Sequence, residues 1–100
     1  MGDNEQPSAQ RSATVRNADG LHARPAEMVA REAMRFESDI RIVREDYRID
    51  AKSILDVLTL GAAEGTELTI TAKGVDAEAA AEAVGRLVES DFEIDSNKAS

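Results

Sequence analysis

Residues 20–26 read Gly20-Leu21-His22-Ala23-Arg24-Pro25-Ala26, and they mark the point where a strand-and-turn pattern stops and an amphipathic helical pattern begins. His22 is the only histidine in the chain, and this position predicts an imidazole at or near a helix start. Pro25 suits a first helical turn because the N–H group that proline lacks would have no partner there. Gly20 provides the backbone freedom for a tight entry. Because a helix N-terminus attracts anions and Arg24 adds a guanidinium group, the stretch suits an imidazole that carries phosphate.

The composition predicts one compact domain and excludes several classes of function. The chain has 100 residues, of which 42% are hydrophobic, and its 12 basic and 20 acidic residues give a net charge of −8. This charge repels nucleic-acid backbones and anionic membrane surfaces, so we expect partner proteins with basic faces. With no cysteine and one histidine, we expect no disulfide, no metal site and no cofactor. The sequence contains neither a membrane-span pattern nor a signal-peptide pattern, so we expect the protein in the cytoplasm.

Hydrophobic periodicity predicts the order strand, helix, strand, strand, short helix, strand, helix. The first long helix places apolar residues on one face, namely Ala26, Val29, Ala30, Ala33 and Phe36. The short helix runs from Ser53 to about Leu60, and the last helix runs from about Asp76 to Ser90. The strands are expected at residues 13–16, 39–44, 47–51 and 66–73, and the third has Tyr47, Ile49 and Ala51 on one side.

Each predicted strand has one apolar and one polar face, which is typical of an antiparallel sheet with one covered side. The predicted fold is therefore α+β: an open-faced two-layer sandwich in which three helices cover one side of a four-stranded antiparallel sheet. The domain is expected to span residues 12–94. Residues 1–11 and 95–100 are expected to be flexible tails, because the N-terminal stretch buries too little apolar surface to offset the cost of ordering it.

The element order and two motifs resemble the HPr family of phosphocarriers. The first motif is residues 20–26, and the second is Ala51-Lys52-Ser53-Ile54-Leu55-Asp56-Val57-Leu58-Thr59-Leu60-Gly61. The resemblance covers residues 12 to about 94 and implies a carrier of the bacterial phosphoenolpyruvate-dependent sugar phosphotransferase system. It implies that His22 accepts phosphate from phosphoenolpyruvate-charged enzyme I and passes it to enzyme IIA domains, with Arg24 assisting the phosphohistidine. Such a carrier is a transfer intermediate with no independent turnover.

The second motif suggests two further functional features. Ser53-x-x-Asp56 matches a helix start in which the serine is the N-cap, and the resemblance implies that Ser53 is also a target of HPr kinase/phosphorylase. The two roles are compatible, but phosphorylation stays open, since Asp56 stands where many members carry glycine or lysine and its carboxylate opposes a phosphoryl dianion one turn away. Ile54, Leu55 and Leu58 are candidate partner contacts because so short a helix cannot bury every apolar side chain.

Two alternatives remain at this level. A paralogue could serve nitrogen or carbon regulation, with its phosphorylation state read by protein targets. A non-transferring interaction module could use the same sandwich to bind an enzyme or a regulator. Asp19 also leaves a question open, because a carboxylate close to His22 opposes bound phosphate. We expect a monomer in each case.

Overall fold

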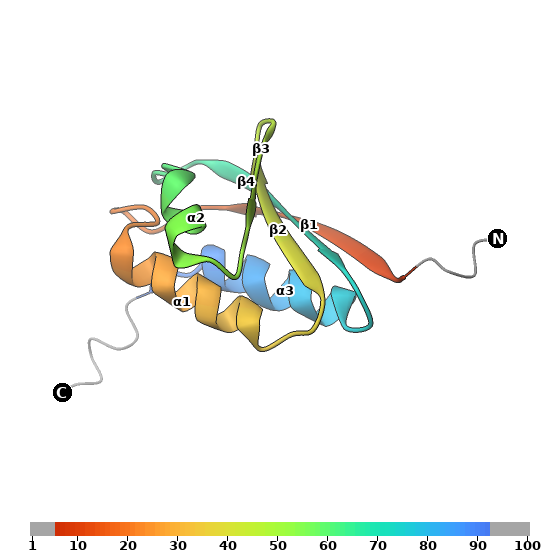
Figure 1. Ribbon diagram of the computed structural model, residues 1–100. Coiled ribbons are helices and arrows are strands. Elements are labelled where there is room, and N and C mark those ends of the chain that lie inside the picture. Colours follow the sequence, from red (N-terminus) through yellow and green to blue (C-terminus); the bar gives the residue numbers. More distant parts are fainter. Residues whose placement is uncertain (1–5, 93–100) are drawn as a thin grey trace.

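The structure is a computed structural model that describes residues 6–92. Seven elements follow the predicted order (Figure 1). The strands are β1 (Ser8–Thr14), β2 (Asp39–Arg44), β3 (Tyr47–Asp50) and β4 (Glu67–Lys73). The helices are α1 (Ala23–Met34), α2 (Ile54–Thr59) and α3 (Ala77–Val88).

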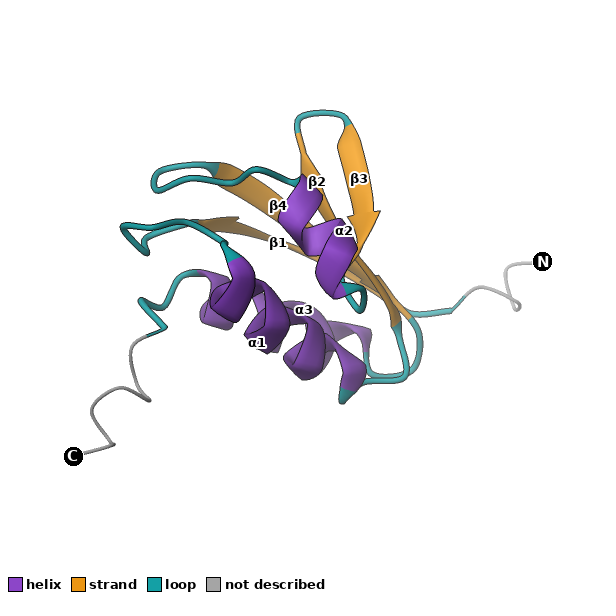
Figure 2. Ribbon diagram, turned by 60° about the vertical axis from the view of Figure 1, so that its left-hand side comes forward, coloured by secondary structure: helices purple, strands orange, loops and turns teal. Residues whose placement is uncertain are grey.

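The strands form one antiparallel sheet in the order β1-β4-β2-β3. Figure 2 shows all three helices on one side of this sheet, so the other side is open. Side-chain alternation explains the arrangement: along β4, Leu68, Ile70 and Ala72 are buried while Thr69 and Thr71 are only half-buried. The predicted open-faced sandwich is therefore confirmed, with an aliphatic core between the sheet and the helices.

Strand β1 begins earlier than predicted. It starts at Ser8 and pairs with β4 along its whole length, so residues 8–11 lie in the sheet and the prediction of a tail over them is wrong. The reason is that the backbone ladder needs no apolar side chain, and Arg11 on this strand reaches α3 to contact Glu82 at 3.2 Å and Glu89 at 3.4 Å. The predicted tail at 95–100 lies outside the described residues.

Tyr47 is an exception to the predicted inner face of β3. Ile49 and Ala51 are buried as expected, but 47% of Tyr47 is exposed. Its hydroxyl lies 2.7 Å from the Thr59 hydroxyl, so the ring reaches outward to the end of α2 and does not enter the core. Within residues 6–92, none of the helices has the length and apolar character needed to cross a bilayer.

A carboxylate joins the loop before β2 to the start of α3. Asp76 accepts hydrogen bonds from the Ser38 hydroxyl (2.6 Å), the Ser38 N–H (3.0 Å) and the Glu37 N–H (3.0 Å). Ser38 is the one buried polar residue in the described part of the chain. The Ser38 hydroxyl, followed by the Glu37 N–H, lowers the pKa of Asp76 below its ordinary value of 3.8.

This carboxylate makes the stability of the fold depend on pH. Because the pKa of Asp76 is lower in the folded state, its ionisation stabilises the fold fully above the unfolded pKa, and this contribution disappears as the pH falls below 3.8. We expect Asp76→Asn to be less stable than the wild type at pH 7 and to lose less stability between about pH 5 and pH 2. Urea unfolding of both proteins at several pH values measures the difference. Parallel stability curves would contradict this role of Asp76.

Candidate functional site

The loop that leads into α1 is held in place by hydrogen bonds to backbone carbonyl groups. The Leu21 N–H donates to the Ala62 carbonyl at 3.0 Å, and the Asn17 side chain donates to the Gly20 carbonyl at 2.9 Å. Gly20 has a φ of +72°, and a Cβ atom added there would lie 2.5 Å from the Ala62 carbonyl oxygen. Only glycine combines a positive φ with the absence of a Cβ atom, so Gly20 fixes the path of the chain toward His22.

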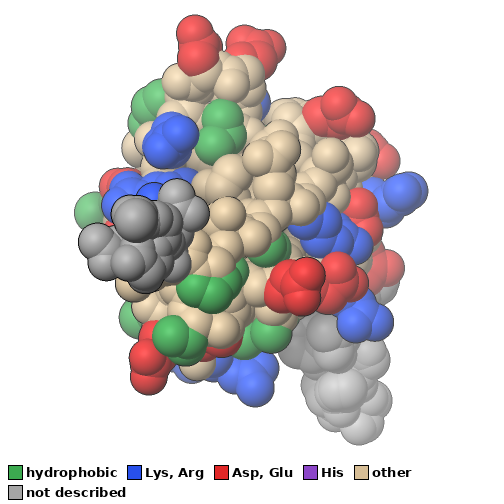
Figure 3. Space-filling model, turned by 90° about the vertical axis from the view of Figure 1, so that its right-hand side faces the viewer, with side chains coloured by type: hydrophobic (Ala, Val, Ile, Leu, Met, Phe, Trp, Pro, Cys, Tyr) green, Lys and Arg blue, Asp and Glu red, His purple; other side chains and the backbone are tan. Residues whose placement is uncertain are grey.

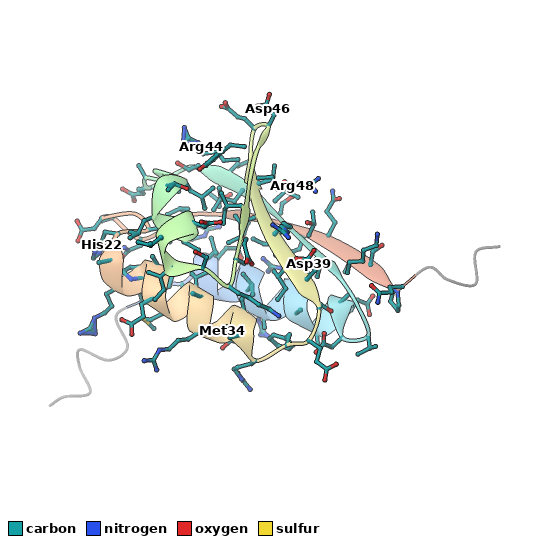
Figure 4. All side chains as sticks on the ribbon, viewed as in Figure 1. His22, Met34, Asp39, Arg44, Asp46 and Arg48 are labelled. Atoms are coloured by element: carbon teal, nitrogen blue, oxygen red, sulfur yellow. The ribbon has the colours of Figure 1, made fainter. Side chains whose placement is uncertain are left out.

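His22 is the N-cap of α1, which confirms its predicted position at or near a helix start. Its backbone is extended (φ −82°, ψ −161°), and its carbonyl accepts the hydrogen bond from the Ala26 N–H at 2.8 Å. The side chain is exposed and makes no capping hydrogen bond. Figure 4 shows His22 at the N-terminal end of α1. The imidazole is thus not occupied by the structural task that an N-cap side chain usually performs, and its nitrogens remain available for chemistry.

The first turn of α1 favours a negatively charged group beside this imidazole. It contains no acidic residue. The first N–H groups of an α-helix have no carbonyl partner within the helix, and the helix dipole adds a partial positive charge. Pro25 is buried in the same turn and lacks an N–H group.

Arg24 is exposed, two residues after His22. Together with Glu27, Met28 and Arg31 it lines a shallow depression of about 400 Å³. Met28 is half-buried and also packs against the core, so it lies between the surface and the core.

Ser53 is the N-cap of α2 in the geometry that the sequence predicted. Its hydroxyl oxygen accepts a hydrogen bond from the Asp56 N–H at 3.1 Å. The Asp56 carboxylate in turn accepts a hydrogen bond from the Asp50 N–H at 3.3 Å. Ser53 is half-buried, so the hydroxyl has a structural task that the His22 imidazole lacks.

The short helix α2 presents apolar side chains to solvent. The exposed fractions are 41% for Ile54, 73% for Leu55 and 36% for Leu58, whereas Val57 is fully buried. Helix α2 packs against α1. The exposed apolar side chains therefore lie on a helix adjacent to the one that His22 caps. We call Ile54, Leu55 and Leu58 the α2 patch.

Three contacts that hold α2 in place were missed by the sequence analysis. Arg44 donates to the Leu60 carbonyl at the end of the helix (2.5 Å), and Lys52 donates to the Phe36 carbonyl just after α1 (2.8 Å). The third is the Tyr47–Thr59 hydroxyl pair. Each joins residues at least 12 positions apart in sequence, and no local pattern signals such a pairing. Among residues 6–92, no three His, Cys, Asp or Glu side chains are grouped so that they could hold a metal ion.

Comparison with known proteins assigns this arrangement to a family. A family model described as "PTS HPr component phosphorylation site" matches residues 9–90. The chain belongs to the HPr family. It is 43% identical over 79 residues to the phosphocarrier protein HPr of Treponema pallidum (strain Nichols), and the match covers 79% of this chain and 90% of that protein.

Two further relatives agree with this assignment. The HPr-like protein Crh of Bacillus subtilis (strain 168) is 38% identical over 80 residues, covering 80% of this chain and 94% of Crh. The crystal structure of a phosphocarrier protein HPr from Bacillus anthracis str. Ames has a TM-score of 0.76 at 39% identity, covering 80% of this chain and 95% of that one. The chain is therefore an HPr-family phosphocarrier protein of the phosphotransferase system, as its two motifs predicted.

Proposed function

We propose that this HPr-family chain accepts a phosphoryl group on His22 from phosphoenolpyruvate-charged enzyme I and passes it to enzyme IIA domains in sugar uptake. The observation that carries the proposal is the exposed His22 imidazole, which sits at the N-cap of α1 and makes no capping hydrogen bond. A neutral imidazole carries a lone pair on one ring nitrogen, which can act as a nucleophile without a dedicated base.

The transfer is a substitution at phosphorus. A ring nitrogen of His22 donates its lone pair to the phosphorus atom, the N–P bond forms, and the bond from phosphorus to enzyme I breaks. The reverse substitution, with an enzyme IIA domain as the acceptor, returns the imidazole to its starting form. Helix N–H groups and the Arg24 guanidinium stabilise the charge on the phosphoryl oxygens. No metal held by this chain is required.

The α2 patch is the proposed contact surface for both partners. Transfer requires two active sites to meet, and exposed apolar side chains beside the phosphorylated residue supply interface area that excludes water. The patch lies on α2, which packs against the helix that begins at His22.

We expect Leu55→Glu to slow phosphoryl transfer from enzyme I by about 10-fold or more, because a charge would be buried in the contact. Since 73% of Leu55 is exposed, the free energy of unfolding should change by less than about 0.5 kcal/mol. Stopped-flow or quenched-flow transfer rates measure the effect. Val75→Glu is the matched control, because Val75 is 76% exposed and lies in the loop between β4 and α3. An equal slowing in both variants would show that the patch has no special role.

Regulatory phosphorylation of Ser53 is the second part of the proposal. The hydroxyl caps α2, and a phosphoryl group there would add negative charge beside the proposed docking surface. The nearby Asp56 carboxylate opposes that charge, so Asp56→Asn should make Ser53 a better substrate. The test is an acid-stable phosphate formed with ATP and an HPr kinase/phosphorylase and absent in Ser53→Ala. If neither the wild type nor Asp56→Asn gains this phosphate, Ser53 is only a helix cap.

A transfer assay with enzyme I and enzyme IIA domains distinguishes a role in sugar transport from a regulatory role. The chain is charged with phosphoenolpyruvate, Mg²⁺ and enzyme I, re-purified, and mixed with sugar-specific enzyme IIA domains. The proposal expects loss of phosphate from the carrier and its appearance on an enzyme IIA domain. The similarity to Crh supports a regulatory paralogue as the second candidate. A carrier that is charged by enzyme I and is not discharged by any sugar-specific enzyme IIA domain would favour that second candidate.

A further inference from the structure

The open face of the sheet carries a groove that phosphoryl transfer does not use. Its volume is about 520 Å³, and it crosses all four strands. The helices lie on the other side of the sheet (Figure 2), so this face is not covered by the described chain. Its main polar lining consists of Gln10, Asp39, Arg41, Arg48, Thr71 and Lys73.

Two cations in this groove have no partner among residues 6–92. Of the Lys and Arg side chains in residues 6–92, only Arg16, Arg48 and Lys73 form neither an ion pair nor a hydrogen bond with the described residues. Arg48 and Lys73 line the groove, whereas Arg16 does not. The groove also contains Arg41, which is paired with Asp39 at 3.0 Å. The groove therefore has an unbalanced positive charge, although the whole chain has a net charge of −8.

The strand register gives the spacing of the two unpaired cations. Lys73 pairs with Asp39, whereas Arg48 pairs with Val43, which is itself paired with Thr69 on β4. Arg48 thus lies four residues along and two strands across from Lys73, which corresponds to roughly 16 Å between their Cα atoms. Side chains on one face of a sheet stand roughly perpendicular to it, so cations at this spacing match two anionic groups of one ligand better than a single phosphate or carboxylate. An extended segment of about five residues has the required reach.

Charge and composition select the kind of ligand. A long polyanion such as nucleic acid would also meet the repulsion of the −8 chain, and the lining residues include no aromatic side chain on which a base could stack. A short acidic stretch of a protein contacts only the local positive surface. We propose that the open face of the sheet docks an acidic segment of a protein partner, with Arg48 and Lys73 as its charged contacts.

The location of this groove allows docking and phosphoryl transfer together. Arg48 and Asp39 lie well away from His22 in Figure 4, and the α2 patch lies on a helix that covers the opposite face of the sheet. Figure 3 shows Lys and Arg side chains (blue) as well as Asp and Glu side chains (red) around a tan area of backbone and other side chains, and no histidine is visible on this side. A bound acidic segment would therefore leave the imidazole exposed.

The test uses a fluorescein-labelled peptide with six consecutive glutamates and the full-length protein, and fluorescence anisotropy at about 20 mM ionic strength, where screening is weak. We expect saturable binding that Arg48→Ala and Lys73→Ala each weaken by about 3-fold or more, and that the double variant weakens by about 10-fold or more. Arg16→Ala is the matched control, because Arg16 is exposed and unpaired but does not line the groove. It should bind the peptide like the wild type, and all variants should accept phosphate from enzyme I at the wild-type rate.

Several results would overturn the proposal. Absence of peptide binding to the wild type would do so, as would an equal loss of affinity in Arg16→Ala. Tighter binding of an oligonucleotide of the same charge would assign the groove to nucleic acid. If inorganic phosphate displaced the peptide completely at the same concentration of negative charge, the groove would be assigned to small anions. Circular dichroism and urea unfolding of the double variant show whether any loss of binding comes from unfolding.

Discussion

His22→Ala is expected to abolish phosphoryl acceptance from phosphoenolpyruvate-charged enzyme I, with a loss of at least about 1,000-fold in transfer rate. The imidazole is the nucleophile of the proposed reaction, and the chain has no second histidine and no cysteine to replace it. The helix N-terminus and Arg24 can hold phosphate but cannot form a bond to phosphorus. Incorporation of phosphate from labelled phosphoenolpyruvate, with enzyme I and Mg²⁺, measures the loss.

The same variant should fold normally, which separates chemistry from stability. Replacing a capping side chain costs about 1 kcal/mol when its hydrogen bond is lost, but the His22 side chain makes no such bond. We therefore expect His22→Ala to change the free energy of unfolding by less than about 0.5 kcal/mol. Ser53→Ala is the contrasting variant, because it removes the 3.1 Å bond to the Asp56 N–H and should lose about 1 kcal/mol. Retained phosphorylation of His22→Ala would refute the assignment of the acceptor.

Gly20→Ala is expected to lower the free energy of unfolding by about 2–4 kcal/mol, the largest effect on stability among the predictions. The residue has a φ of +72°, which alanine adopts only with strain, and the new Cβ would meet the Ala62 carbonyl oxygen at 2.5 Å. That oxygen accepts the hydrogen bond from Leu21, so relief of the clash would disturb the approach to His22. Urea unfolding at pH 7 measures the loss.

Gly65→Ala measures the cost of backbone strain without a clash, and so separates the two effects that Gly20→Ala combines. Gly65 also has a positive φ (+89°), but a Cβ atom there would have no atom within 4 Å. We expect it to lose only about 1 kcal/mol. Equal losses in the two variants would show that the contact with Ala62 is unimportant. In addition, Gly20→Ala should slow phosphoryl acceptance under conditions where it remains folded, since the loop that positions His22 must shift.

Much of the fold follows from local patterns that the sequence carries. Strict alternation at residues 68–72 and the apolar stripe of α1 predicted a sheet covered on one side, because both patterns report directly which face is buried. The N-cap positions of His22 and Ser53 were also predictable, since glycine, proline and the Ser-x-x-Asp spacing are local signals for helix starts.

The features that could not be predicted depend on distant partners. Strand β1 extends back to Ser8 because β4 pairs with it, and its polar sequence alone does not indicate a strand. Arg44 and Lys52 hold α2 through backbone carbonyl groups that are 16 positions away in each case, and their side chains carry no local sign of this role. The same holds for Ser38 and Asp76, which lie 38 positions apart. The two unpaired groove cations become visible only when the strand register is known.

The most direct test of the account is to locate the phosphoryl group on the wild-type protein. His22 is the only histidine, so labelling histidine with ¹⁵N gives the ring-nitrogen signals of a single imidazole. After treatment with phosphoenolpyruvate, Mg²⁺ and enzyme I, the account predicts one acid-labile phosphoryl group whose ³¹P signal is coupled to a ring nitrogen of His22. A phosphorylated protein without this coupling, or no phosphorylation with several enzyme I proteins, would contradict it.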